Sequence, residues 1–340
     1  MTTARLKLTR AQILAFRRRV GALDERLPRG ARSLRRAAWA GLQDSMPRAA
    51  VVSIHARVQG TRPTTWADPS LVQVWGPRYQ VYVVAARDLP VFSLARLPEG
   101  TKARARSEDL AARLHAFLGG ATTMTYGEAG HGIGVHPNSL RYAAQTGTVV
   151  IRWEGARAPT IWTVPAPEIT PFDARLELAR RYLHVYGPTT PTSFIKWAGI
   201  GAREGREAFE ALGSSLTPVR TPVGDAWTLT DDEPAFRAPG GSTAPARLLP
   251  SGDSFFLLHG ADRALVVPEA GRRDELWTSR VWPGALLVEG EVVGTWRRAK
   301  DLMTVRSWRR LSREAKDAVD AEAQSLPLPG VDAIDVRWEG

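Results

Sequence analysis

The pattern of apolar and polar residues in the first hundred positions predicts three helices followed by two strands. Residues 9–20 carry apolar side chains at helical spacing behind Thr9, a good helix N-cap. The two strands are rich in Val and Tyr, which is typical of half-buried strands. Three helices and a hairpin in this order indicate a winged helix. The other predicted elements are the helices Ser33–Leu42 and Pro47–Val58 and the strands Leu71–Trp75 and Gln80–Ala85.

The same order of elements recurs twice along the chain, at uneven spacing. In the second copy, Glu154-Gly155-Ala156-Arg157 separates two strand-like runs and is the expected turn of a wing. The third copy ends in a hairpin, Leu216–Leu229, that Pro and Gly interrupt. The predicted helices are Glu108–Leu118, Thr125–Ala129, Pro137–Ala144, Pro171–Val185, Thr192–Ala198 and Ala202–Leu212, and the second hairpin has strands Thr148–Trp153 and Pro159–Val164.

Residues 231–246 are rich in Pro, Gly and Ala, and we predict a linker there. Beyond it, four strand-like runs, a charged amphipathic helix and a last strand predict an α+β domain. These elements are Phe255–Leu258, Leu265–Val267, Ala285–Glu289, Val292–Trp296, Ser312–Leu326 and Ala333–Trp338.

The predicted fold class is therefore α+β, with tandem winged-helix (helix-turn-helix) units followed by a C-terminal α+β domain that has a hairpin-rich sheet. We define the first unit as residues 1–100, the second unit as 101–168, the third unit as 169–230 and the C-terminal domain as 247–340.

Charge favours nucleic acid as the partner. The chain has 46 basic and 35 acidic residues, a formal net charge of +11, and a strongly basic balance fits nucleic acid, an anionic surface or an acidic protein. The alternative is an Arg-rich composition that only solvates the surface. No stretch approaches 18 consecutive apolar residues and no secretory signal is evident, so we expect a cytoplasmic protein, monomeric and without a membrane partner.

Composition also limits the chemistry. With no cysteine, the chain has no disulfide, iron–sulfur cluster or thiolate zinc site. His131 and His136 lack the spacing of a helical metal pair, and the glycine runs fit neither a dinucleotide fingerprint nor a phosphate loop. We expect no metal and no cofactor.

The second unit has the clearest candidate surface for reading DNA. Its last helix begins near Asn138, and the start of a recognition helix faces base edges in the major groove. Arg, Asn and Gln are the side chains that make bidentate contacts with bases. The alternative is that these winged helices contact protein. The candidate contacts are Asn138, Arg141, Tyr142 and Gln145 on the helix, Arg152 and Arg157 on the wing, and Arg203 on the last helix of the third unit.

A polar segment, Gln43-Asp44-Ser45, interrupts two apolar stretches. Helix propensity alone predicts a turn in which Asp44 or Ser45 caps the helix that starts near Pro47. This structural account is complete in itself and stays open beside a functional one.

The same stretch carries a family resemblance. Residues 41–50, GLQDSMPRAA, resemble the G-L-Q-x-Q-x-P-x-A-A segment of the AlkZ/YcaQ-type winged-helix DNA glycosylases. Residues 74–90 are similar to the family's strand with R-G-T-L-H, although they have Gly76-Pro77-Arg78 there. Residues 288–297 are similar to its C-terminal V-D-G-x-V-x-G-T-W-R hairpin. The resemblance covers most of the chain.

The resemblance implies a monofunctional DNA glycosylase, acting in repair or in resistance to a genotoxin, that removes alkylated or bulky purines such as N7-guanine adducts from double-stranded DNA. In the family, Q-x-Q or Q-x-D holds the attacking water. Gln43 matches the first position and Ser45 stands at the second, with Asp44 between them as a further candidate acceptor. Arg48 and Arg78 are then expected near DNA. Because Ser45 departs from the motif, a non-catalytic DNA-binding protein, either a regulator or a lesion binder, is the alternative.

Overall fold

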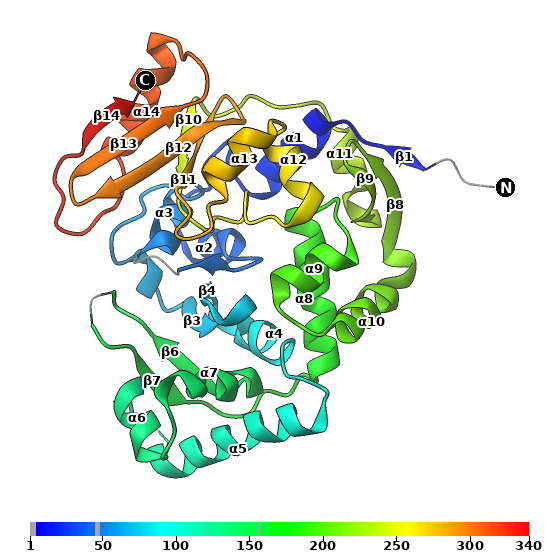
Figure 1. The fold of residues 1–340 in the computed structure, drawn as a ribbon, viewed down its shortest axis with the longest axis vertical. Coiled ribbons are helices and arrows are strands. Elements are labelled where there is room, and N and C mark those ends of the chain that lie inside the picture. The colour runs from blue at the N-terminus through cyan, green and yellow to red at the C-terminus, as the bar shows by residue number, and fades with distance from the viewer. Residues whose placement is uncertain (1–4, 45–47, 121, 156, 340) are drawn as a thin grey trace.

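The computed structural model describes residues 5–44, 48–120, 122–155 and 157–339. These residues form a mixed α+β structure with one five-stranded and three three-stranded sheets (Figure 1). The predicted α+β class is confirmed in this sense. No helix in the described ranges is long and apolar enough to cross a membrane.

A small sheet of the first unit lies at the centre of the molecule (Figure 1), with the strand order β2-β4-β3. Its strands are β2 (Leu42–Gln43), β3 (Leu71–Trp75) and β4 (Val81–Ala85), and the helices α2 (Ala31–Ala37), α3 (Ala49–His55) and α4 (Leu89–Leu94) belong to the same unit. Both predicted strands are confirmed.

The helix predicted at Ser33–Leu42 is too long, because α2 ends at Ala37 and Leu42 lies in β2. Gly41 has a φ of +74°, which a helix does not allow. A Cβ at this position would also lie 2.8 Å from Phe92 and 2.9 Å from Tyr82. Gly41 therefore lets the chain turn closely over the core and enter β2.

The second unit contains α5 (Thr101–Leu118), α6 (Tyr126–Gly132) and α7 (Leu140–Ala143). Its sheet has the order β5-β7-β6, from β5 (Met124–Thr125), β6 (Val149–Arg152) and β7 (Thr160–Thr163). The Thr125 side chain accepts a hydrogen bond from the backbone N–H of Glu128 and caps α6, as predicted. Strand β6 also packs against β3 of the first unit.

The third unit contains α8 (Pro171–Tyr186), α9 (Pro191–Ala198), α10 (Ala202–Leu212) and the hairpin β8 (Leu216–Thr221) and β9 (Gly224–Leu229). The N-terminal segment joins it: β1 (Leu6–Lys7) pairs in parallel with β8, and α1 (Arg10–Val20) packs against α8. The predicted helix at 9–20 and its Thr9 cap are thus confirmed. However, this helix packs beside the third unit.

The predicted linker is partly folded. Residues Glu233–Arg237 form α11, and Phe236 is buried and stacks on Phe16 of α1 with ring centroids 3.8 Å apart. The linker prediction is wrong for these residues, because composition does not show that Phe236 packs on α1 or that Arg19 of α1 donates to the backbone oxygen of Ala235.

The C-terminal domain is built on a five-stranded sheet in the order β10-β11-β12-β13-β14, in which only β13 and β14 are parallel. The predicted strands at 255–258 and 265–267 are wrong. The first is a buried turn segment, and the second consists of the last two residues of α12 and the residue that follows it. The elements are β10 (Ala246–Leu249), α12 (Arg263–Val266), α13 (Ala270–Leu276), β11 (Gly284–Val288), β12 (Glu291–Ala299), β13 (Leu302–Ser307), α14 (Arg313–Gln324) and β14 (Asp335–Glu339).

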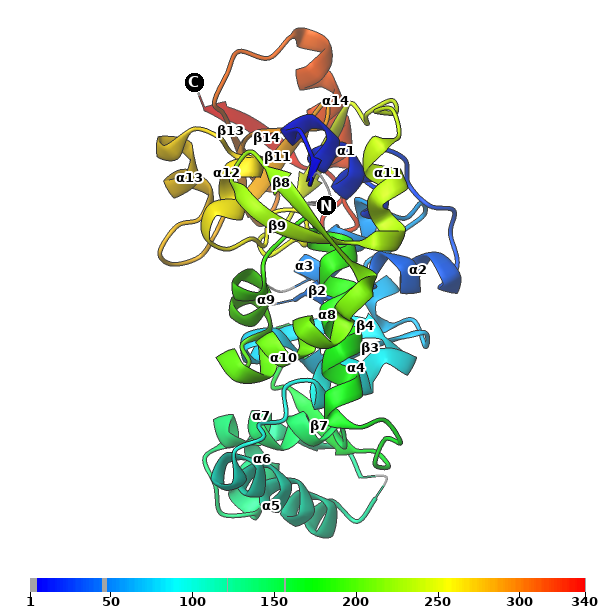
Figure 2. The ribbon, with the colours of Figure 1, turned by 90° about the vertical axis from the view of Figure 1, so that its right-hand side faces the viewer.

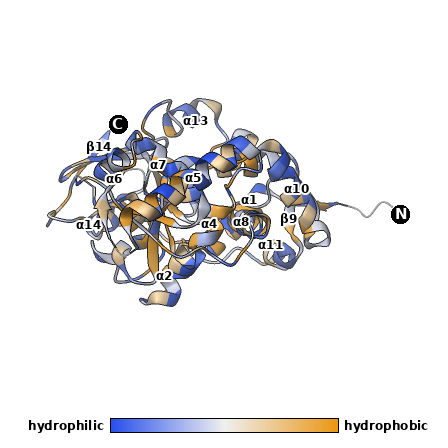
Figure 3. Cartoon of the chain, turned by 90° about the horizontal axis from the view of Figure 1, so that it is seen from below, coloured by the Kyte–Doolittle hydropathy of each residue, from blue (hydrophilic) through white to orange (hydrophobic). Residues whose placement is uncertain are grey.

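Seen from the side, the molecule is elongated, with α14 and the C-terminal sheet at one end and α5 at the other (Figure 2). The hydropathy colouring places the hydrophobic segments inside and the hydrophilic faces of helices such as α5 outside (Figure 3). In both ribbon views the first unit lies between the second unit and the C-terminal domain (Figures 1 and 2), so residues from both can reach it.

Candidate active site

Gln43 lies at the edge of the central sheet and borders a pocket. In β2, Leu42 is buried in the core, and the partly exposed Gln43 pairs in register with Tyr82 of β4. The buried Tyr82 hydroxyl donates a hydrogen bond of 3.3 Å to Gln43 Oε1. Burial raises the pKa of Tyr82 to about 12, so its hydroxyl keeps its proton at neutral pH and fixes the amide.

We call the cavity beside this amide the Gln43 pocket, with a volume of about 460 Å³. Its walls come from the first unit and the C-terminal domain, and none of the described lining residues is Asp or Glu. The lining residues besides Gln43 are Arg78, Gln80, Ser251, Arg280, Val281 and Trp282.

A turn of the C-terminal domain closes on Gln43. Gly252 has a φ of +79°, and a Cβ there would lie 2.9 Å from Gln43 Nε2. The positive φ favours glycine, and a Cβ at this position would displace the Gln43 amide from its present place. Nothing in the first hundred residues predicts that Gly252 contacts Gln43. The sequence SGDS at 251–254 indicates a turn but not its partner.

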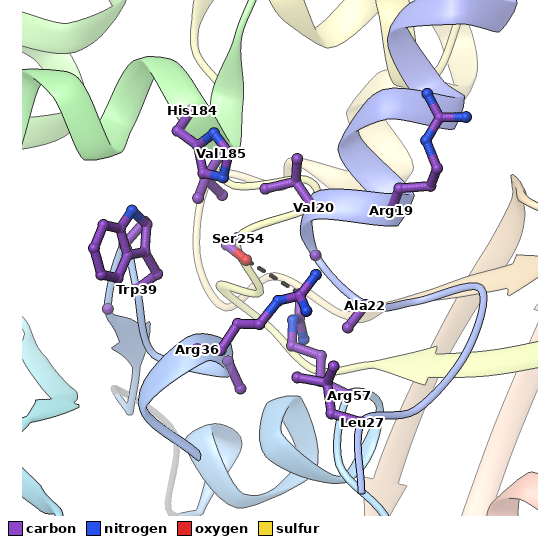
Figure 4. A pocket seen from close by; sticks show the side chains of 14 residues that line it. Arg19, Val20, Ala22, Leu27, Arg36, Trp39, Arg57, His184, Val185 and Ser254 are labelled. Carbon is purple, nitrogen blue, oxygen red and sulfur yellow. Dashed lines mark hydrogen bonds between the residues drawn. The ribbon is translucent and has the colours of Figure 1, made fainter. Parts of the chain in front are cut away.

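The turn is anchored by a buried ion pair. Arg57 donates to both oxygens of Asp253 at 2.7 Å, and the Ser53 hydroxyl donates to the same carboxylate at 2.7 Å. Arg57 also donates to the Ser254 hydroxyl at 3.1 Å. Figure 4 shows this hydrogen bond. Both residues line a separate cavity of about 250 Å³, which Trp39 and His184 also line. The end of α3 thus holds the turn that contacts Gln43.

Asp44 points away from the Gln43 pocket into the interior. Its carboxylate is fully buried and accepts hydrogen bonds from the backbone N–H of Ala50, at 3.0 Å, and from Gln73 Nε2, at 2.9 Å. Arg48 lies 3.7 Å from the same carboxylate. Burial raises the pKa of Asp44. Arg48, not Asp44, stands at the N-cap of α3, but the Asp44 carboxylate still accepts from an N–H in the first turn of that helix. Ser45, the other predicted cap, lies outside the described residues.

Arg48 ties this segment to the second unit. Its guanidinium donates to the backbone oxygen of Trp153 at 3.2 Å and lies 4.0 Å from the ring centroid of Trp66. Gln73 makes a parallel link, because its Oε1 accepts from the Trp153 N–H at 2.7 Å. Arg48 is therefore partly buried between the units and does not line the Gln43 pocket.

Two of the predicted DNA contacts border a further cavity. We call it the Asn138 pocket, with a volume of about 270 Å³; Asn138 and Arg141 line it, and Gln80 is shared with the Gln43 pocket. Tyr142 is partly exposed and meets the Tyr79 ring edge-on at 5.2 Å.

Gln145 requires a correction. It is only 3% exposed and donates hydrogen bonds to the backbone oxygen of Arg96, at 2.8 Å, and to the Tyr79 hydroxyl, at 3.2 Å. The Ser107 hydroxyl donates to its Oε1 at 3.2 Å. Its amide is thus hydrogen-bonded inside the protein and is not placed to contact DNA. The turn at 144–146 packs against α5, so Gln145 faces that helix.

Of the other predicted contacts, three arginines are paired with carboxylates and one lines the Gln43 pocket. Arg152 and Arg157 both pair with Glu154, at 2.7 and 3.3 Å. Arg203 pairs with Glu99 at 3.0 Å. Arg78 lines the Gln43 pocket, as already described, in a left-handed conformation with a φ of 55°. Within the described ranges, no cluster of three or more His, Asp or Glu side chains could hold a metal ion.

Known proteins match this chain in sequence and in fold. An interstrand DNA cross-link repair glycosylase from Streptomyces sahachiroi is 28% identical over 176 residues, which cover 49% of this chain and 46% of the relative. The solved structure of the Streptomyces sahachiroi DNA glycosylase AlkZ aligns with a TM-score of 0.77 over 98% of this chain and 100% of that one. At 18% identity, this second likeness bears on the fold.

A family model described as DNA glycosylase AlkZ-like matches residues 34–327. That range includes Gln43, the turn at Gly252 and both pockets. The match confirms the resemblance found in the sequence, and the chain belongs to the AlkZ-like DNA glycosylase family.

Proposed function

We propose that this protein is a monofunctional DNA glycosylase that removes alkylated or bulky purines from duplex DNA. The observation that carries the proposal is the placement of Gln43. This residue stands at the first position of the family motif, and the Tyr82 hydroxyl and the Gly252 turn hold it at the wall of a pocket. In the proposal, the three helix–hairpin units act as winged helices that hold the duplex.

The proposed reaction is hydrolysis at the sugar. Water adds to C1′ while the C1′–N9 bond breaks, and the electron pair of that bond passes into the purine. When N7 is alkylated, the base starts as a cation and leaves neutral, while the water loses one proton to solvent and remains as the C1′ hydroxyl of an abasic site. Gln43 would orient the water, which is the kind of preorganised polar contact that lowers a barrier.

The composition of the pocket restricts the substrate. No described residue lining the Gln43 pocket carries a carboxyl group, and Asp44 is turned inward and already accepts two hydrogen bonds. The described residues therefore supply no acid to protonate a poor leaving group. We infer that the substrates are purines whose alkylation already makes the base a good leaving group.

Charge around the pocket suits the DNA backbone. Arg78 and Arg280 line the Gln43 pocket, and guanidinium groups bind phosphate well. We propose that they hold the phosphates beside the extruded nucleotide, since a base must leave the stack to be cut.

Release of free base from a duplex with one N7-methylguanine tests the proposal. We expect single-turnover release by the wild-type protein and a large loss of the release rate in Gln43→Ala, with no release from uracil-containing duplex.

The lack of a carboxylate among the described lining residues also favours the alternative, a lesion binder without catalysis. Tight binding of the N7-methylguanine duplex without release of base would establish that alternative.

A further inference from the structure

The Asn138 pocket adjoins the Gln43 pocket but is a separate cavity. Gln80 lines both cavities, and the next residue, Val81, lines the Asn138 pocket. The backbone oxygen of Val81 accepts a hydrogen bond of 2.7 Å from the Asp44 N–H. The two cavities therefore adjoin at Gln80, next to a residue that is hydrogen-bonded to the motif segment.

The lining of the Asn138 pocket suits a nucleobase. Four aromatic residues line it, Trp75, Tyr79, Tyr126 and Trp153. Its polar contributors include two amides, from Gln80 and Asn138, which can each donate to and accept from the edge of a base. Its volume of about 270 Å³ lies near the lower end for ligand pockets, roughly 300 Å³, so it fits one base better than a length of strand.

The polar groups of this pocket are held in place. The Tyr126 hydroxyl donates to Asn138 Oδ1 at 3.0 Å and fixes the amide. The guanidinium of Arg141 lies 5.1 Å from the Tyr79 ring centroid and 5.3 Å from that of Tyr142. Its buried Nε has no hydrogen-bond partner among the described residues. A preformed donor set and aromatic walls are what an unpaired base requires.

We propose that the Asn138 pocket is a second base-binding subsite, which receives the base that a cross-link joins to the base being excised. Two linked bases cannot separate, so when one enters the Gln43 pocket the other is drawn out of the duplex with it and needs an adjoining cavity. The Streptomyces sahachiroi relative is described as an interstrand DNA cross-link repair glycosylase. This inference rests on the proposed glycosylase function and assigns the second base of such a substrate to a place in this protein, the Asn138 pocket.

The test compares two duplexes, one with a single N7-methylguanine and one in which a short alkyl linker joins the N7 atoms of guanines on opposite strands. Asn138→Ala and Tyr126→Ala should slow single-turnover release from the cross-linked duplex roughly tenfold, the effect of losing one stacking or polar platform for a base. Release of N7-methylguanine should stay within about twofold for Tyr126→Ala. Asn138→Ala, at a predicted DNA contact, should slow release less on this duplex than on the cross-linked one. The matched control is Gln59→Ala, which removes an exposed amide outside both pockets.

Equal losses on both duplexes would overturn the subsite, because the pocket would then only hold DNA in general. Unchanged release from the cross-linked duplex would overturn it as well. A wild-type protein that releases neither base would instead refute the glycosylase function. In that case the affinities for the two duplexes test the subsite. Gln43→Ala should bind the cross-linked duplex more tightly than the N7-methylguanine duplex, and adding Asn138→Ala should remove this preference. Equal affinities of Gln43→Ala for the two duplexes would refute the subsite.

Discussion

At the scale of single residues, the proposed chemistry depends on the orientation of one amide. Gln43 sits between a phenol that keeps its proton, Tyr82, and a glycine turn, Gly252, that leaves space for its side chain. A glutamine placed this way can present the same face of its amide to each substrate. Tyr82 and Gly252 therefore belong to the candidate site as positioning residues, although no motif predicts them.

We expect Gln43→Ala to slow single-turnover release of N7-methylguanine about 100-fold, because one preorganised polar group typically contributes that much. Tyr82→Phe should slow it less, since the amide stays but loses its orienting donor. Thermal melts should change little for Gln43→Ala, whose side chain is partly exposed. A slower reaction that only follows a lower melting temperature would assign Gln43 to folding.

For Asp44 we expect the opposite behaviour. Asp44→Ala leaves the Ala50 N–H and the Gln73 amide without their acceptor, which costs about 1–3 kcal/mol for each buried group left unpaired. Urea denaturation should show this loss in the free energy of unfolding, while release of base well below the melting temperature stays within a few-fold. Unchanged stability with abolished release would give Asp44 a catalytic role.

At the scale of elements, the sequence predicted those that depend on local signals. Thr9 and Thr125 cap the helices expected of them, and the hairpins at 71–85 and 149–163 are where Val- and Tyr-rich runs or a turn indicate them. Elements set by distant contacts were missed. The apolar run Phe255–Leu258 has the composition of a strand, but it is a buried turn segment next to an ion pair between Arg57 and Asp253.

The candidate site could be predicted only where it is contiguous in sequence. Residues 41–50 pointed to Gln43, and the order of helices and strands pointed to Asn138 and Arg141, which line one pocket. The ion pair Arg57–Asp253 joins positions almost 200 residues apart. Such pairing has no local pattern, and the inward turn of Asp44 likewise depends on Gln73.

The turn at 250–257 depends on the ion pair between Arg57 and Asp253. Arg57→Ala leaves a buried carboxylate unpaired, which typically costs about 3–5 kcal/mol. We expect a lower free energy of unfolding by urea denaturation and, below the unfolding transition, slower release of base, because the Gly252 turn loses its anchor. The double variant Arg57→Met, Asp253→Leu should recover much of the stability, since an apolar pair removes the unpaired charge. Equal stability of the single and double variants would contradict this account.

At the scale of the whole molecule, two histidines link stability to pH. Burial, together with the charges of Arg26 and Arg247, lowers the pKa of His55 to about 3. Burial, together with Arg78, Arg263 and Lys196, lowers that of His259 to about 4. The unfolded chain therefore binds more protons than the native state below pH 6.5, and stability contributed by the neutral rings is lost as pH falls toward 4.

We expect the free energy of unfolding to fall between pH 7.5 and 5, and to fall less in His55→Gln than in the wild type. Asp44, whose pKa is raised by burial, acts in the opposite sense, so the comparison is made between proteins that all keep Asp44. His131→Gln, at an exposed position, is the control and should follow the wild type. A His55→Gln variant with the full pH dependence would contradict the assignment.

Binding to duplex DNA should depend on salt, and the arginines should contribute unequally. With a net charge of +11, each phosphate that the protein neutralises steepens the fall of log affinity with log salt by about 0.9. Arg141 and Arg280 line the two pockets, and neither pairs with a carboxylate within the described ranges. Arg152 and Arg157 both pair with Glu154, so each must break this ion pair before it can bind a phosphate. Fluorescence anisotropy across a NaCl series should therefore give slopes that are lower by about 1 for Arg141→Gln and Arg280→Gln, and by less for Arg157→Gln.

Glu154→Gln provides the opposite test, because it releases Arg152 and Arg157 from their shared carboxylate and should raise affinity at low salt. Arg313→Gln, on α14 at the end of the molecule away from α5 (Figure 2), is the control and should leave the slope unchanged. A flat salt response in the wild type would contradict DNA binding altogether. Weaker binding by Glu154→Gln would mean that this carboxylate holds the β6–β7 hairpin in its binding geometry, and that Arg152 and Arg157 reach DNA while still paired to it.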